Sequence, residues 1–357
     1  MPITGFKSGS QSEGRLSFLS PQFLPQFIQY YLINNLMNRF TNVYVTGSIA
    51  YDTIMDFGKE FKEYFHPEKL HQINVSFVVG NLKKQIGGTG TNISYNIAQI
   101  FNFQFSFFNK KTAIHLLGSI GKDGKEFINF FKKNKIDASG VIVDKNLYTA
   151  SGSVITDIKN NQIWGFYYGA SERISQTDFN KYNKKTDFFI ISANHRNSFL
   201  YFQREAIKHK IDYLYDPGMA LTWINDKDLK EGVMSCRYLV GNDYEIAMIF
   251  KRLKKTVNEL TGSGLKIITT LGEKGVRYEE HNKIYKIDGY RVKKVIDPTG
   301  AGDAWRGGFI AGLLMNYLIK DCLKLGNVMA SFAIEKYGTV NHKPTKKEIK
   351  KRMKIIE

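Results

Sequence analysis

From residue 41 onward, the sequence alternates between segments typical of strands and segments typical of helices. Short runs rich in β-branched and aromatic residues are followed by longer runs with apolar residues at helical spacing, as in residues 91–103 and 303–318. Parallel strands joined by helices require right-handed crossovers, which place helices on both faces of the sheet. We therefore expect a doubly wound α/β fold with a mostly parallel sheet, whose ligands bind at the carboxyl ends of the strands.

The pattern also predicts the order of the elements. Strands are expected at residues 42–49, 113–120, 188–192, 213–215, 238–240 and 265–270. Helices are expected at residues 91–103, 125–135, 198–208, 246–260, 303–318, 323–337 and 345–354. Strand-like segments without a helix between them occur at residues 51–57 with 72–85, and at residues 151–168. We expect these inserted strands to form a small β-sheet lid over the ligand site.

The two ends of the chain differ from this alternating region. Residues 1–40 contain Pro21 and Pro25, which interrupt any helix, and few acidic residues. We expect them to be an extension outside the fold. A single domain should follow over residues 41–344, with a basic helix over residues 345–357.

The formal net charge of +18 raises the question of nucleic-acid binding. Of the 51 basic residues, 40 are lysines and 11 are arginines, spread along the whole chain. Because bidentate contacts to bases and phosphates favour arginine, we expect no nucleic-acid partner. The 2 cysteines cannot form a disulfide framework, and no apolar run reaches the length of about 18 residues that a membrane span needs. We therefore expect a cytoplasmic protein without a membrane partner.

The most specific motif is DPTGAGDAWRGGF at residues 297–309. It places a Gly-rich turn between the end of a strand and a long apolar helix. Gly300 and Gly302 let the backbone approach a ligand closely, and the helix N-terminus offers unpaired N–H groups to a phosphate. Asp303 in this place is either a helix cap or a base that accepts the proton of an attacking hydroxyl.

Two common nucleotide-binding motifs are missing from the sequence. No G-x-x-x-x-G-K-[ST] segment occurs, which excludes a P-loop mechanism, and no G-x-G-x-x-G follows the first strand, which disfavours a dinucleotide enzyme. Residues 297–303 instead resemble the second signature of the ribokinase-like (PfkB) kinases, commonly D-T-x-G-A-G-D, with Pro298 in place of the threonine.

Three further elements resemble that family and occur in its order. Residues 87–98, with two glycines followed by Asn92, resemble the first signature. Residues 242–245 match the N-x-x-E element, and residues 270–275 match the nucleotide turn T-x-G-x-x-G. Within the family, the segments that look most like bacterial adenosine kinases are residues 45–52, 70–77 and 165–170.

The resemblance implies a role for each matched residue. Asp303 would be the catalytic base, and the N–H groups of Gly300, Ala301 and Gly302 would hold the γ-phosphoryl group in an anion hole. Glu245 would bind Mg²⁺ indirectly, through water. The acceptor substrate would contact Ser48, Asp52, Gly87, Gly88, Asn92, Phe166 and Asn194, and ATP would contact Asn242, Thr270, Gly272 and Gly275.

Several of these roles have a structural alternative. Asp52 either accepts the 2′- and 3′-hydroxyls of a ribose or closes a turn. Asn242 and Glu245 are also spaced as a capping box, and both roles are compatible. Phe166 either stacks on a base or packs in the lid core. Bacterial adenosine kinases tend to have a second aromatic after a Thr-Ala pair; this chain has Ser151-Gly152 there, so one wall of the base pocket stays unassigned.

The resemblance implies an ATP-dependent kinase that phosphorylates the 5′-hydroxyl of adenosine to AMP with Mg²⁺, while a need for K⁺ stays open. The alternative within the family is a sugar kinase acting on ribose, fructose or a fructose phosphate, for which Arg173 and Arg196 are the candidate cationic contacts. A nucleic-acid-binding protein on an inactive kinase scaffold is disfavoured, because Asp303 and the N-x-x-E element are intact. Lid strands that pair across a dimer axis would give a homodimer.

Overall fold

The computed structural model describes residues 40–65, 75–101, 113–159, 161–175 and 177–356. The predicted N-terminal extension lies outside these residues except for Phe40, which is buried and packs on Phe188 with ring centroids 4.7 Å apart. Within the described part of the chain, no helix combines the length and the apolar character needed to cross a membrane.

Nine of the described strands form one sheet. In spatial order these are β13 (Lys283–Ile287), β12 (Val276–Glu280), β11 (Lys266–Thr270), β10 (Tyr238–Asn242), β9 (Tyr213–Asp216), β8 (Asp187–Ser192), β1 (Asn42–Thr46), β4 (Ala113–Ile120) and β5 (Val141–Val143). The strands from β11 to β5 are parallel, and the hairpin β12–β13 adds two antiparallel strands at one edge. The strand order reverses between β1 and β8, and the carboxyl ends of strands at such a point form a ligand crevice.

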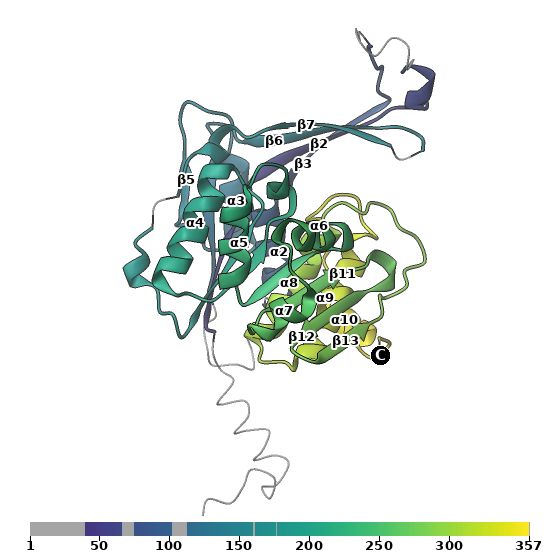
Figure 1. Ribbon diagram of the computed structural model, residues 1–357. Coiled ribbons are helices and arrows are strands. Elements are labelled where there is room, and N and C mark those ends of the chain that lie inside the picture. Colours follow the sequence, from purple (N-terminus) through teal and green to yellow (C-terminus); the bar gives the residue numbers. More distant parts are fainter. Residues whose placement is uncertain (1–39, 66–74, 102–112, 160, 176, 357) are drawn as a thin grey trace, which may run out of the picture. The chain divides into compact units, whose positions relative to one another are not determined.

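Helices pack against both faces of this sheet, which confirms the doubly wound α/β prediction (Figure 1). In β8, Phe188 and Ile190 belong to one buried cluster, while Phe189 and Ile191 belong to the other. The first cluster includes α2 (Thr89–Phe101), α3 (Lys125–Lys133), α8 (Ala301–Leu314), α9 (Ile319–Ala333) and α10 (Lys346–Met353). The second includes α4 (Arg196–His209), α5 (Asp226–Ser235), α6 (Asp243–Leu253) and α7 (Val257–Gly262).

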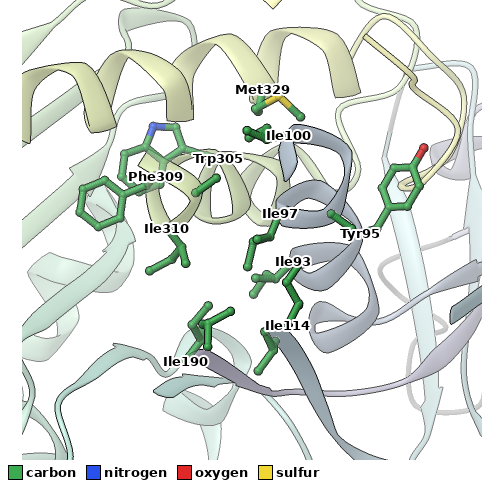
Figure 2. Packing of buried hydrophobic residues seen from close by; sticks show 14 of the residues in the cluster. Ile93, Tyr95, Ile97, Ile100, Ile114, Ile190, Trp305, Phe309, Ile310 and Met329 are labelled. Atoms are coloured by element: carbon green, nitrogen blue, oxygen red, sulfur yellow. The ribbon is translucent and has the colours of Figure 1, made fainter. Parts of the chain in front are cut away.

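The packing of α2 and α8 positions the site. Figure 2 shows isoleucines of these helices gathered with those of β4 and β8: Ile93, Ile97, Ile100, Ile114, Ile190 and Ile310. Burying a side chain of this size contributes roughly 1.5–3 kcal/mol, so the cluster strongly favours this arrangement. Both helices are thereby held with their first turns close enough for the side chains of Asn92 and Asp303 to bond.

Four of the strands in the described part of the chain form a second, smaller sheet, in the order β3 (Asn81–Gly87), β2 (Ala50–Asp56), β6 (Ala150–Thr156) and β7 (Gln162–Tyr167). β2 and β6 are parallel, and the other two pairs are antiparallel. This is the lid sheet expected from the broken alternation (Figure 1). The strand expected at residues 72–85 is β3, which starts only at Asn81; residues 75–80 form no strand, and residues 66–74 are outside the described part.

Strand β5 and helix α5 were not predicted at all, and two further details of the element prediction were wrong. The single helix expected over residues 246–260 is two helices, because Lys254 takes a left-handed conformation with φ 51° and Thr256 caps α7 through a capping box with Glu259. The hairpin β12–β13 was not predicted, since charged residues interrupt the apolar pattern in both strands, and the edge strand β13 is largely exposed. Neither detail changes the sheet around the predicted site.

Candidate active site

The loops after β1 and β8 meet at the point where the strand order reverses. Ser48, just after β1, donates its N–H to Ala193 O at 3.2 Å. Its Oγ accepts the N–H of Thr89 at 3.0 Å, and its carbonyl accepts the N–H of Gly90 at 2.9 Å. Ser48 therefore ties the first turn of α2 to the carboxyl ends of two central strands, where the fold places its ligand crevice.

The Gly-rich turn before α8 is held by Asp297. Its Oδ1 accepts the N–H of Thr299 at 2.9 Å, and its Oδ2 accepts the N–H of Gly338 at 2.9 Å. Gly300 is the N-cap of α8 and has φ +76°, a conformation that favours glycine. The N–H groups of Gly300, Ala301 and Gly302 are the ones predicted to form an anion hole. The N–H of Ala301 donates to Pro298 O at 3.2 Å within the turn.

Asp303 is the third residue of α8, and α8 has no side-chain cap. Its Oδ2 instead accepts a hydrogen bond from Asn92 Nδ2, 2.8 Å away on α2. Burial raises the pKa of Asp303, while the nearby Arg306 and the Asn92 hydrogen bond act to lower it. The structure thus brings Asp303 and Asn92 together and orients the carboxylate toward the start of α2.

Asp52 on β2 belongs to the same group of carboxyls. Burial raises its pKa to about 7, and the charges of Asp303 and Asp297 add to the shift. Its Oδ2 lies only 1.9 Å from the place where a Cβ on Gly87 would be. The carboxylate therefore occupies the space beside Gly87, and Gly88 follows with φ +89° where β3 turns into α2.

Replacing Gly87 by Ala should displace the Asp52 carboxylate, because no side chain fits at that distance. If Asp52 binds the acceptor as the resemblance implies, the KM for a ribose-containing acceptor should rise by about tenfold or more, since about 1.4 kcal/mol of lost binding is a factor of ten. Gly165→Ala on β7 is the control, because a Cβ there meets nothing within 4 Å. An unchanged KM in the Gly87→Ala variant would contradict contact between Asp52 and the acceptor.

Asp52, Gly152 and Phe166 form one row across the lid. Asp52 pairs with Gly152 on β6, and Gly152 pairs with Phe166 on β7. Side chains of paired residues lie on the same face of a sheet, and two strand spacings amount to about 10 Å. Gly152 therefore leaves an open interval between a carboxylate and an aromatic ring, which the sequence alone did not indicate.

A series of aromatic contacts connects Phe166 to the loop after β8. The ring centroids of Phe166 and Tyr168 are 5.0 Å apart, and those of Tyr168 and His195 are 5.1 Å apart, both edge to face. The buried Asn194 is next in sequence and accepts the N–H of His195 with its own Oδ1 at 2.8 Å. Tyr168 lies in the segment 165–170 that resembles bacterial adenosine kinases but was given no role, and His195 lies in none of the recognised motifs.

The predicted nucleotide residues lie side by side at the carboxyl ends of β10 and β11. Asn242 and Thr270 are register partners in the parallel pair of strands. Asn242 and Glu245 form a complete capping box at the start of α6, with both hydrogen bonds 2.8 Å long. Gly272 and Gly275, with φ +60° and +86°, form the turn after β11.

A buried ion pair that was not predicted from the sequence lies beside these residues. Arg306 on α8 and Asp216 at the end of β9 are 7% and 3% exposed. The DPG corner at residues 216–218 and the helical spacing of Arg306 from Gly302 were available signals. Arg173, named for a sugar phosphate, instead pairs with Asp144 at 2.7 Å, and Arg196 is exposed at the start of α4.

Comparison with known proteins finds that the chain is similar to sugar and nucleoside kinases. The profile of the pfkB family carbohydrate kinases matches residues 51–346. A nucleoside kinase from Methanocaldococcus jannaschii is 27% identical over 294 residues, covering 81% of this chain and 92% of that protein. A ribokinase from Lactococcus lactis is 27% identical over 293 residues, covering 76% of this chain and 86% of that protein. The structure of a Burkholderia thailandensis nucleoside kinase in complex with inosine matches with a TM-score of 0.77 and 26% identity, covering 88% of this chain and 97% of that one.

Proposed function

This chain belongs to the pfkB family of carbohydrate kinases, and we propose that it transfers the γ-phosphoryl group of ATP to the 5′-hydroxyl of adenosine, giving AMP. The row of Asp52, Gly152 and Phe166 on one face of the lid carries this proposal. It offers a carboxylate to a ribose diol and, about 10 Å away, an aromatic ring to a base. Asp52 also interacts with the charge of Asp303. In the proposed complex, a ribose bound by Asp52 presents its 5′-hydroxyl to the carboxylate of Asp303.

In the proposed reaction, the 5′-oxygen forms a bond to the γ-phosphorus as the bond from that phosphorus to the β,γ-bridging oxygen breaks. Asp303 accepts the proton of the hydroxyl, and ADP leaves with the electron pair of the broken bond. Asn92 donates to Oδ2 of Asp303, so we assign Oδ1 to the hydroxyl proton. Burial raises the pKa of Asp303 and makes it a stronger base than an exposed aspartate.

Mg²⁺ fits the donor chemistry beside α6. Glu245 engages the Asn242 N–H with Oε2, which leaves Oε1 as the oxygen to orient a metal-bound water. Within the described residues, no group of three or more His, Cys, Asp or Glu side chains could hold a metal ion, so ATP phosphates and water would supply most ligands. When bound, Mg²⁺ neutralises charge on the phosphates.

The relatives support a nucleoside as acceptor and leave a sugar as the second candidate. The Burkholderia thailandensis kinase was solved with inosine, a purine nucleoside, and the Methanocaldococcus jannaschii relative is a nucleoside kinase. The Lactococcus lactis ribokinase is as similar to this chain as the Methanocaldococcus jannaschii kinase, at 27% identity, and supports ribose as the acceptor instead. A free sugar would leave the ring of Phe166 without a stacking partner.

Phe166→Ala distinguishes the two acceptors. If a base stacks on this ring, the KM for adenosine should rise by about 10- to 100-fold, because stacking on an aromatic contributes about 1–3 kcal/mol. Any turnover of ribose should be unchanged. Initial rates of ADP release with adenosine, inosine, other nucleosides, ribose, fructose and fructose 6-phosphate measure both effects.

Tyr167→Ala is the matched control for this experiment. Tyr167 is the next residue on β7, so its side chain lies on the opposite face of the lid. It should leave every KM near that of the wild type. Turnover of sugars alone by the wild type would disprove adenosine as acceptor and keep the kinase assignment.

A further inference from the structure

Arg306 is a buried cation held by a buried carboxylate. Its Nε lies 2.5 Å from Asp216 Oδ2, and its Nη2 donates to Asp216 Oδ1. Burial raises the pKa of Asp216, while the charge and the hydrogen bond of Arg306 oppose this shift and favour the ionised pair. Replacing such a pair by apolar residues is often neutral or stabilising, which means that stability alone does not account for its presence.

The guanidinium of Arg306 lies against the Gly-rich turn. Arg306 follows Gly302 by four residues, and side chains of a helix lean toward its N-terminus, so the two share one face of α8. Nη1 is 2.8 Å from the place where a Cβ on Gly302 would be. While Nε and Nη2 face Asp216, Nη1 therefore lies beside the backbone that is predicted to hold the γ-phosphoryl group.

Three carboxylates share the charge of Arg306. Asp216, Asp303 and Glu245 all interact with it, and they lie on different elements: β9, α8 and α6. Burial alone would lower the pKa of Arg306, but the three carboxylates raise it and keep the side chain charged. Since ATP would bring further negative charge to this place, a fixed cation there stabilises the phosphates during transfer.

We propose that Arg306 is a catalytic residue that donates from Nη1 to the transferred phosphoryl group, and that Asp216 is the positioning residue that fixes its guanidinium beside Gly302. The proposal rests on the phosphoryl transfer proposed above and is independent of which acceptor is used. Sequence spacing alone does not reveal it, because Asp216 and Arg306 are 90 residues apart.

Arg306→Gln should lower kcat by about 10²- to 10³-fold, the cost of removing one donor to a developing charge, with a smaller change in the acceptor KM. Loss of this cation should raise the pKa of Asp303, whose other neighbours are Asn92 and Asp52. Because Asp303 acts as a base only when ionised, the acid limb of the kcat/KM profile should move to higher pH. Arg306→Lys keeps the charge and should restore the wild-type acid limb with part of the rate. Asp216→Asn should lower kcat by about tenfold, because an asparagine no longer offers two carboxylate oxygens to Nε and Nη2 of Arg306 and holds the guanidinium less firmly.

Arg237→Gln is the matched control. Arg237 pairs with Asp212 at 3.1 Å, at the amino ends of β10 and β9, opposite the site. Its loss should lower the melting temperature without moving the pH profile. If Arg306→Gln behaves like this control, with near wild-type kcat and acid limb, the catalytic role of Arg306 is disproved.

A binding measurement tests the proposal without turnover. Mg·ADP with aluminium fluoride mimics the transferred group, and the wild type should gain melting temperature from it beyond the gain from Mg·ADP alone. Arg306→Gln and Asp216→Asn should lose that extra gain, and Arg306→Lys should keep part of it. An equal extra gain in Arg306→Gln would overturn the proposal. If the wild type phosphorylates a sugar but not adenosine, the adenosine assignment is disproved. The Arg306 variants are then compared on that sugar, because the role proposed for Arg306 does not depend on the acceptor.

Discussion

Asp303→Asn should lower kcat by about 10³-fold or more, while the KM for ATP stays close to that of the wild type. The asparagine keeps the shape of the side chain, and its oxygen still accepts the hydrogen bond from Asn92, but it takes no proton from the acceptor. Because burial raises the pKa of Asp303, removing the charge should leave the melting temperature equal or higher. A coupled ADP-release assay and calorimetry measure the two quantities.

Asp226→Asn is the control for a purely structural role of the acid. Asp226 is also in the first turn of a helix, α5, and pairs with Arg252 at 2.7 Å away from the candidate site. An acid that only complements a helix N-terminus is worth about 0.3–1 kcal/mol of stability. Full turnover in Asp303→Asn, with a small stability loss like that of Asp226→Asn, would exclude Asp303 as the base.

The KM for adenosine should fall about tenfold between pH 6 and pH 8, because a carboxyl with a pKa of about 7 becomes ionised over this range. Only the ionised form of Asp52 accepts a hydrogen bond from both hydroxyls of the ribose diol. 2′,3′-Dideoxyadenosine keeps the 5′-hydroxyl and lacks the diol, so its KM should not follow this titration. If the KM values of both compounds change with pH in the same way, Asp52 does not bind the diol.

Asp52→Asn should weaken adenosine binding and stabilise the free protein. A carboxyl whose pKa is raised on folding binds its proton more tightly in the folded state, so stability falls as pH rises from about 4 to 7. This shift in pKa corresponds to a loss of roughly 4 kcal/mol of stability at most. The melting temperature of Asp52→Asn should therefore be higher than that of the wild type at pH 8 and equal to it at pH 4. Asp56→Asn, at the exposed end of the same strand, is the matched control. A lower melting temperature for Asp52→Asn at pH 8 would contradict this account.

Much of the fold could be predicted because each element bears its own local pattern. The strand over residues 113–120 was predicted with its observed bounds, since a short, mostly apolar run is typical of a buried strand in a parallel sheet. The break between α6 and α7 was missed, because apolar spacing continues through Lys254 while its backbone reverses. The edge hairpin β12–β13 was missed because its polar alternation does not stand out from a loop.

The sequence by itself determined the α/β class, the lid, and a Gly-rich turn followed by an acid at the start of a helix. These features depend on residues close together in the chain, whose periodicity and backbone preferences act locally. Only the tertiary structure decided that Asp303 bonds Asn92 across 211 positions and that Asp216 holds Arg306 across 90. Only strand register decided that Gly152 separates Asp52 from Phe166 on one face. Such pairings follow from which helices and strands pack or bond together, and no local pattern specifies a partner that lies far along the chain.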